Sequence, residues 1–150
     1  MIRRAALSDL GALLSMGRKF FAASGYADIA RFDEESFRRT VDQLMTDNAV
    51  CLVAEIDGQV VGAAGALAYP FYFDASHKTG QEVFWWLDPE HRGGQVGIRL
   101  FAELEAWARA QGCKSFTMIA LDAVDAWRVG KIYQRCGYRP SEHSYIKELK

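Results

Sequence analysis

The sequence is poor in the features that mark several large classes of protein. It has three cysteines in 150 residues, far apart at Cys51, Cys113 and Cys136, so no disulfide framework is indicated. No apolar run approaches the roughly 18 residues of a membrane-spanning helix. The first residues also lack the long apolar stretch of a signal peptide. We therefore expect a reduced, cytoplasmic protein that does not enter a membrane.

An excess of charge and a metal-ligand pattern are missing as well. The chain has 18 Lys and Arg against 19 Asp and Glu, with a net charge of −1. Proteins that bind nucleic acids broadly need a basic excess to neutralise phosphates, so we expect no nucleic-acid partner. His77, His91 and His143 share no ligand spacing with each other or with the cysteines, so we expect no metal site.

Few residues or segments interrupt regular structure or separate domains. It has only three prolines, and it contains no internal repeat and no low-complexity linker. Half of its residues are hydrophobic, and a chain of this length buries about 68–70% of its unfolded surface. Residues 1–150 are therefore expected to form a single domain around one core.

Hydrophobic periodicity predicts an α+β fold with a mixed sheet and about four helices. A short opening strand precedes a helix capped by Ser8 and stopped by Ser24-Gly25, and Asp33 caps a second helix. Around the turn Asp57-Gly58, residues 49–56 and 59–69 are typical of two antiparallel strands. The remaining expected elements are a loop over 70–80, a strand over 81–87, a helix over 97–111, a strand over 114–121, a helix over 124–136 and a closing strand over 145–149. Strand, helix and strand within about 40 residues indicate that 81–87 and 114–121 are parallel.

A glycine-rich segment joins the strand over 81–87 to the next helix. The first N–H groups of a helix have no intrahelical partner and lie at the positive end of the helix dipole, so this position suits a phosphate. It is not the G-x-G-x-x-G dinucleotide motif, because Arg92 stands where glycine is needed, and no G-K-[ST] of a P-loop follows. The spacing leaves two interpretations open, a phosphate site or a turn that lets strand and helix pack closely.

Two separated segments resemble the GNAT superfamily of acyl-CoA-dependent N-acyltransferases. The family motif runs as an apolar residue, any residue, Pro, two residues and [QR]-x-x-G-x-[GA]. Residues 87–97 follow this frame, with Gln95 where the family usually has glycine. Tyr133 to Tyr138 is similar to the family signature Y-x-x-x-G-[FY], while Ala126 and Val129 stand where Asn and Ala often precede it. The order of expected elements agrees over nearly the whole chain.

The resemblance implies a GNAT-like fold and direct transfer of acetyl from acetyl-CoA to a primary amine of a small molecule or peptide. It implies a pyrophosphate held by main-chain N–H groups, and pantetheine lying where two parallel strands splay near a bulge. The implied cofactor-binding residues are Trp86, Leu87, Arg92, Gly93, Gly94, Gln95, Val96, Gly97 and Ile98. The acceptor is not identified, and a homodimer is left open.

Two side chains are candidates for the proton transfers of this reaction. Many members of the family place a glutamate base on the strand that holds Glu82, where burial among aromatic residues would raise its pKa. The alternative is a solvated residue at the start of a strand. Tyr133 matches the family tyrosine that donates to the leaving thiolate. Its alternative is a core ring with its hydroxyl at the surface.

Aromatic residues are also candidates for the acceptor side, although most aromatic residues in any fold belong to the core. They are Phe20, Phe21, Tyr26, Phe71, Tyr72, Phe73, Trp85 and Trp86. A rival function remains, since Gln95 and Ala126 depart from the family pattern. The chain would then be a non-catalytic acyl-CoA sensor or interaction module. Glu82 and Tyr133 favour the enzyme.

Overall fold

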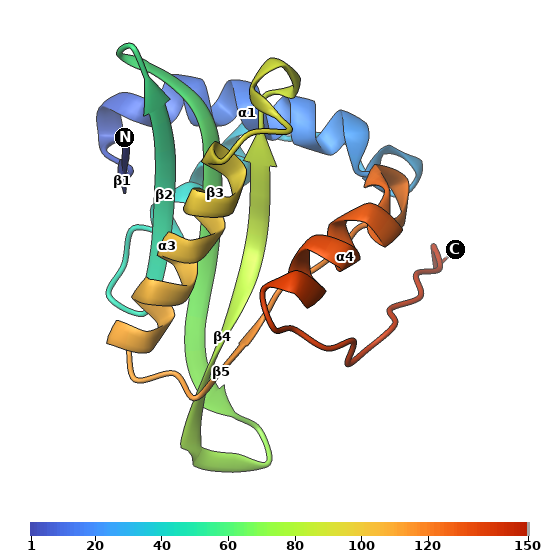
Figure 1. Ribbon diagram of the computed structural model, residues 1–150. Helices are drawn as coiled ribbons and strands as arrows, with labels where there is room; N and C mark the ends of the chain where they lie inside the picture. The colour runs from blue at the N-terminus through green and yellow to red at the C-terminus, as the bar shows by residue number, and fades with distance from the viewer. Residues whose placement is uncertain (150) are drawn as a thin grey trace.

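Five strands form one mixed sheet. The structure is a computed structural model and describes residues 1–149. The strands lie side by side in chain order, β1 (Ile2–Arg4), β2 (Ala49–Ile56), β3 (Gln59–Phe71), β4 (Asp74–Leu87) and β5 (Ser115–Thr117). The first four are antiparallel, and β4 pairs with β5 in parallel. The predicted mixed sheet and its parallel pair are confirmed (Figure 1).

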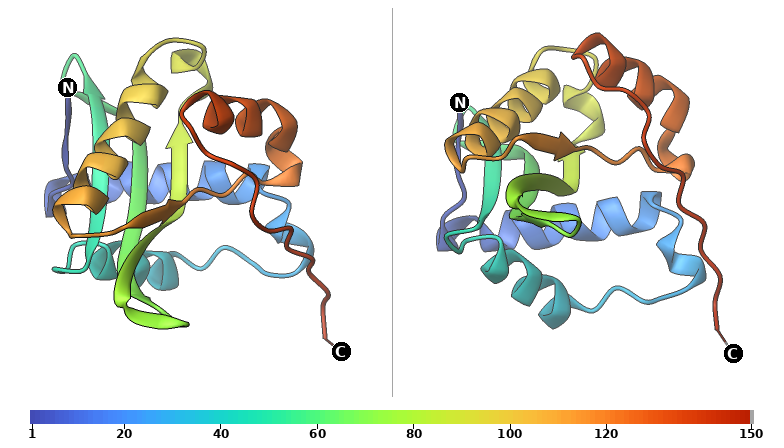
Figure 2. Two further views of the ribbon diagram at one scale, coloured as in Figure 1. Left: turned by 60° about the horizontal axis from the view of Figure 1, so that its bottom comes forward. Right: turned by 90° about the horizontal axis from the view of Figure 1, so that it is seen from below.

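Helices cover both faces of this sheet. They are α1 (Leu10–Ala23), α2 (Glu34–Gln43), α3 (Val96–Ala110) and α4 (Ala126–Arg135). Figure 2 shows α1 and α2 on one face and α3 and α4 on the other. The predicted cap of α2 is confirmed, because the Asp33 carboxylate accepts a hydrogen bond from the N–H of Ser36 at 2.8 Å. None of the described helices has the length and apolarity needed to span a bilayer.

Small residues in the middle of β3 let the helices approach the sheet closely. Residues 62–66 are all Gly or Ala. A Cβ at Gly65 would lie 2.6 Å from Cδ1 of Leu44 and 3.0 Å from Cε1 of Phe84. Bulky side chains therefore come from the neighbours of β3, with Leu13 and Val41 packing on one face of the sheet and Leu100 and Leu104 on the other.

The predicted loop over 70–80 is wrong, since β3 and β4 continue through it to a hairpin at Tyr72-Phe73. The sequence signal against a strand was Pro70, which has no N–H to donate. The N–H of Ala68 donates to the carbonyl of Asn48, just before β2 begins. The backbone nitrogen of Pro70, two residues further along β3, faces the same side as that of Ala68. It lies beyond the first residue of β2, so no strand there needs an N–H from it. Proline is tolerated at such an open edge.

Three smaller predictions also fail. Residues 145–149 form no strand, because no strand lies beside them within the described chain, and the Tyr145 side chain is 96% exposed. The predicted strand over 114–121 shortens to β5, since β4 leaves it. Ser8 does not cap α1. It lies in a 3₁₀ turn, and Asp9 is the residue that precedes the helix.

Candidate functional site

The parallel strands β4 and β5 separate within the sheet. Their ladder ends at the pair Gln81 and Thr117, although β4 continues beyond it. Just past this point Val83 is the extra residue of a bulge, because Glu82 and Phe84 pair with consecutive residues of β3. A bulge bends its strand and increases the local twist. The chain after β5 therefore parts from β4, as the resemblance implies.

The two predicted catalytic side chains bond to the backbone of one residue, Ile119, across this gap. The Glu82 carboxylate accepts a hydrogen bond from the N–H of Ile119 at 2.9 Å. The Tyr133 hydroxyl donates to the carbonyl of the same residue, also at 2.9 Å. Both side chains are buried. They supply the partners that strand pairing no longer provides.

Burial changes the proton affinity of Glu82. Loss of solvent raises the pKa of its carboxyl to about 7, although the hydrogen bond from Ile119 opposes this. Glu82 is therefore not the solvated residue of the alternative interpretation. A carboxyl that titrates near neutral pH has the affinity needed to take a proton from a reacting amine.

Tyr133 keeps its proton for the same physical reason. Burial, followed by the nearby charge of Glu82, raises its pKa well above its usual range. The ring packs against Phe101 at 5.9 Å and Trp85 at 6.0 Å between centroids. The alternative of a surface hydroxyl is not what the structure shows, since the hydroxyl points to Ile119 in the gap. Tyr133 therefore stays protonated near neutral pH, where it can donate a hydrogen bond or a proton but cannot act as a phenolate base.

A cavity of about 960 Å³ includes this gap. Phe20 and Trp86 line it from the α1 side of the sheet, and Trp85 and Tyr133 line it from the α3 side. The cavity thus passes from one face of the sheet to the other where the strands part. Its volume lies within the range of about 300–1,000 Å³ that is typical of ligand sites.

The glycine-rich loop forms one end of the cavity. Gly93, Gly94, Gly97 and Ile98 line it, and a Cβ at either of the first two would contact nothing within 4 Å. The first intrahelical bond of α3 runs from the N–H of Arg99 to Gln95. Within residues 1–149 the preceding N–H groups of α3 have no hydrogen-bond partner, so they are available to an anion. Close packing occurs as well, since a Cβ at Gly97 would lie 3.4 Å from Trp85.

Not every predicted cofactor residue lines the cavity. Gln95 and Val96 do not, although both belong to the start of α3. Trp86 and Leu87 do, and the N–H of the next residue, Asp88, donates to Val61 on β3. Because N–H groups alternate in direction along a strand, the N–H of Leu87 faces the gap instead.

Arg92 joins the strand end to the loop. Its Nε donates to the carbonyl of Leu87 at 2.8 Å, and its guanidinium lies 4.4 Å from the centre of the Trp86 ring. The terminal nitrogens of the guanidinium have no hydrogen-bond partner within residues 1–149. They are therefore available to an anion at the loop.

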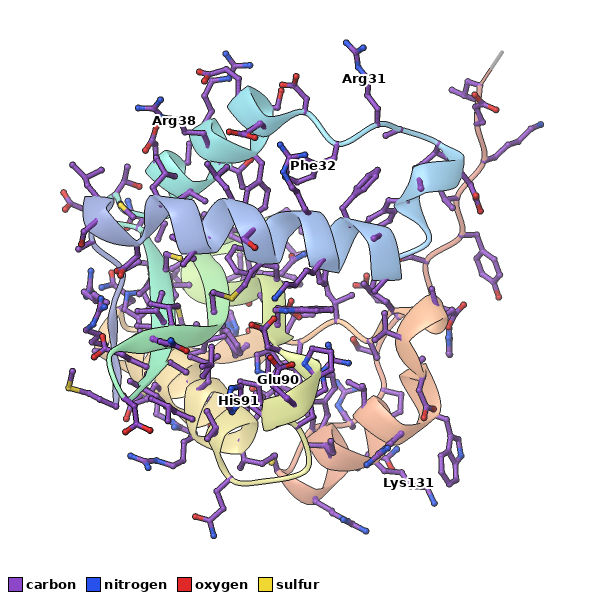
Figure 3. The ribbon with its side chains drawn as sticks, turned by 90° about the horizontal axis from the view of Figure 1, so that it is seen from above. Arg31, Phe32, Arg38, Glu90, His91 and Lys131 are labelled. Carbon is purple, nitrogen blue, oxygen red and sulfur yellow. The ribbon has the colours of Figure 1, made fainter. Side chains whose placement is uncertain are left out.

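Sequence reasoning missed the basic face of α4. Arg128, Lys131 and Arg135 line the cavity, and their spacing of three and four residues places them on one side of the helix. That spacing was visible in the sequence. Figure 3 labels Lys131 on α4, and Glu90 and His91 in the segment that precedes α3. The cavity that ends at the loop thus carries three cations from α4 in addition to Arg92.

The predicted aromatic residues divide between several places. Phe20, Tyr26, Trp85 and Trp86 line the cavity. Phe21 packs against Phe32 instead, with 5.8 Å between ring centroids. The remaining three, Phe71, Tyr72 and Phe73, lie at the β3–β4 hairpin and do not line the cavity.

Comparison with known proteins agrees with this geometry. The sequence model described as "Acetyltransferase (GNAT) family" matches residues 18–138. The chain is similar to a thialysine N-epsilon-acetyltransferase of Sus scrofa, with 29% identity over 85% of this chain and 81% of the relative. It is also similar to an aminoglycoside N(6')-acetyltransferase of Stenotrophomonas maltophilia, with 28% identity over 64% of this chain and 63% of the relative.

Solved structures share the fold. An aminoglycoside 6'-N-acetyltransferase of Acinetobacter haemolyticus superposes with a TM-score of 0.75 and 22% identity, covering 100% of this chain and 98% of the other. A protein of Clostridium acetobutylicum described as a predicted acetyltransferase, solved with acetyl-CoA, gives a TM-score of 0.77 and 17% identity over 99% of this chain and 96% of the other.

The raised pKa of Glu82 predicts how stability depends on pH. The ordinary pKa is 4.5 and the folded-state pKa is about 7, so the folded protein keeps a proton that the unfolded chain releases between these values. The free energy of unfolding should therefore fall as pH rises through this window, by up to about 3 kcal/mol. Glu82→Gln cannot titrate and should gain stability relative to the wild type over the same window.

Urea unfolding at about pH 5 and about pH 8 measures this difference. Glu142→Gln, at an exposed position, is the matched control and should show no pH-dependent difference from the wild type. An equal gap between wild type and Glu82→Gln at both pH values would show that the carboxyl titrates normally.

Proposed function

Because the chain belongs to the acetyltransferase (GNAT) family and is thus an acyltransferase, we propose that it transfers acetyl from acetyl-CoA directly to a primary amine. One observation carries the proposal. A buried carboxyl and a buried phenol face the same gap in the sheet, inside a cavity that ends at an unpaired helix N-terminus. Acetyl-CoA supplies an activated thioester when it is bound.

The loop end of the cavity suits the phosphates of CoA. Gly93 and Gly94 leave room, the first amides of α3 are unpaired, and Arg92, Arg128, Lys131 and Arg135 add positive charge. Pyrophosphate would be held mainly by main-chain N–H groups, as at other helix N-termini. The basic side chains of α4 would then face the remaining phosphate.

Glu82 is the proposed general base. An ammonium group has no lone pair, so the acceptor must lose a proton before it attacks a carbonyl. A carboxylate with a pKa of about 7 can remove that proton more readily than an ordinary one. The N–H of Leu87 faces the gap and would donate to the oxygen of the thioester carbonyl as negative charge develops there.

Tyr133 is the proposed acid. Its pKa is raised, so it is protonated at neutral pH and can donate to a leaving thiolate. In the structure it donates to the carbonyl of Ile119, and during transfer this hydrogen bond would be exchanged for one to the thiolate.

An amine panel with acetyl-CoA tests the function. Free CoA thiol and acetylated amine, the latter identified by its mass, should form in equal amounts. Both should form only when enzyme, acetyl-CoA and amine are all present. Saturable binding of acetyl-CoA without transfer to any amine would favour the non-catalytic sensor instead.

An acidic residue in the loop should weaken binding. Gly94→Asp places a carboxylate where the phosphates would lie, so the Kd for acetyl-CoA should rise by at least about tenfold, which corresponds to 1.4 kcal/mol. Calorimetry measures it. Gly11→Asp adds the same charge in the first turn of α1, where a Cβ meets nothing within 4 Å, and should leave the Kd unchanged. Equal affinities for both variants would place the phosphates elsewhere.

Removing the Tyr133 hydroxyl should lower the turnover rate without changing the fold or the affinity for acetyl-CoA. Tyr133→Phe keeps the stacked ring, so the fold and the affinity for acetyl-CoA should survive. A general acid contributes about 10²–10⁴-fold, and one hydrogen bond to developing charge lies at the low end, so kcat should fall by about 10–100-fold. Wild-type turnover would mean that solvent protonates the thiolate. Loss of CoA binding would mean that the hydroxyl is structural.

The Glu82 carboxyl should control the pH dependence of transfer. Since the base must be ionised, kcat should rise with pH and level off above about 7. Glu82→Gln should lose about 10²–10⁴-fold in kcat together with this dependence, while binding of acetyl-CoA persists. Tyr133→Phe is the comparison, because it should keep the rise. A variant at Glu82 that retains the wild-type profile would assign the base to another group.

A further inference from the structure

The cavity has an apolar wall on the side of the sheet that faces α1. Its members come from the end of α1, from β4 and from the segment after β5, and none is charged. They are Phe20, Tyr26, Val83, Trp86, Ile119, Leu121, Ala123 and Val124. The parts of this wall meet in space, because a Cβ at Gly25 would lie 3.4 Å from Ala123.

Aromatic rings give this wall its shape. Phe20 meets Trp86 edge to face, with 6.1 Å between centroids and an angle of 84°. Tyr26 follows α1 and is 40% exposed, so its ring stands at the open side of the cavity. Lys19 is the adjacent cation on α1, and its charge is already matched by Asp88 at 2.8 Å. Arg92 adjoins the same wall, over the Trp86 ring.

Carboxylates are scarce in the cavity. Among its lining residues only Glu82 and Asp125 are acidic, against the four cations Arg92, Arg128, Lys131 and Arg135. Asp125 caps α4 by accepting from the N–H of Arg128, so it lies at the start of the basic helix. Glu82 lies at the gap in the sheet and accepts a hydrogen bond from Ile119 through only one of its two oxygens. Glu82 is thus the one lining carboxylate available to an acceptor amine, among the residues that the structure describes.

We infer that the acceptor is an amine with a single positive charge, carried on an aromatic or similarly apolar body. This inference rests on the proposed function. The amine nitrogen lies at Glu82, and the apolar body packs between Phe20, Tyr26 and Trp86. A polyamine or an aminoglycoside would bring several further positive charges, and these would lie against an apolar wall that offers no carboxylate to pair with them.

Competing acceptors test the inference with the full chain and acetyl-CoA. The value of kcat/KM for 2-phenylethylamine should exceed those for spermidine and kanamycin by about 100-fold or more, as expected when extra charges are left unpaired. A higher kcat/KM for either polycation would overturn the inference and leave the acetyltransferase function intact. Transfer to none of the amines, with acetyl-CoA still bound, would contradict both.

The apolar wall is tested separately by substitution. Tyr26→Ala should raise KM for 2-phenylethylamine by about tenfold with little change in kcat, because it removes a contact with the body of the acceptor and not with the reacting atoms. Tyr26→Phe should restore the wild-type KM. Tyr72→Ala at the exposed hairpin is the control and should change neither constant. An unchanged KM in Tyr26→Ala would show that the acceptor does not use this wall.

Discussion

The two hydrogen bonds to the backbone of Ile119 are the constraint on which the site depends. Where the β4–β5 ladder ends, the N–H and carbonyl of Ile119 lose the partners that a longer strand would provide, and Glu82 and Tyr133 replace them. The gap in the sheet is therefore bridged by the same two side chains that we assign to proton transfer. Shape and chemistry are coupled here, so a variant at either position must be tested for binding as well as for turnover.

Burial of this pair has opposite chemical consequences for its members. Loss of water disfavours both charged forms, which brings the Glu82 carboxyl near neutrality and keeps the Tyr133 phenol protonated. One environment thus yields a base and an acid. The lining of the cavity is divided as well. Basic side chains come from α4 and from the glycine-rich loop, and an apolar wall faces α1. An anionic donor and a largely apolar acceptor would then enter from different sides of the sheet.

Local signals predicted the parts of the fold that depend on neighbouring residues. The cap at Asp33, the turn at Asp57-Gly58 and the apolar stripe of α3 are of this kind. The failures depend on distant pairing. Pro70 is allowed because β2 does not extend beside it, and residues 145–149 form no strand because no strand of the described chain lies beside them. Within the site, the family motifs predicted Tyr133 and the loop. The role of Ile119 could not be predicted, because its backbone carries no sequence signal.

The backbone accommodates both departures from the family pattern, Gln95 and Ala126. A residue with a side chain at a tight loop is strained only where φ is positive, and Gln95 has φ −84° and ψ −13°, which any residue adopts. The left-handed turn is made by Gly93, with φ +84°. Gln95 is also exposed and does not line the cavity. At the other departure, Asp125 caps α4 immediately before Ala126, so the helix begins without an Asn at that position. Gln95 therefore does not strain the loop, and Ala126 does not disturb the start of α4.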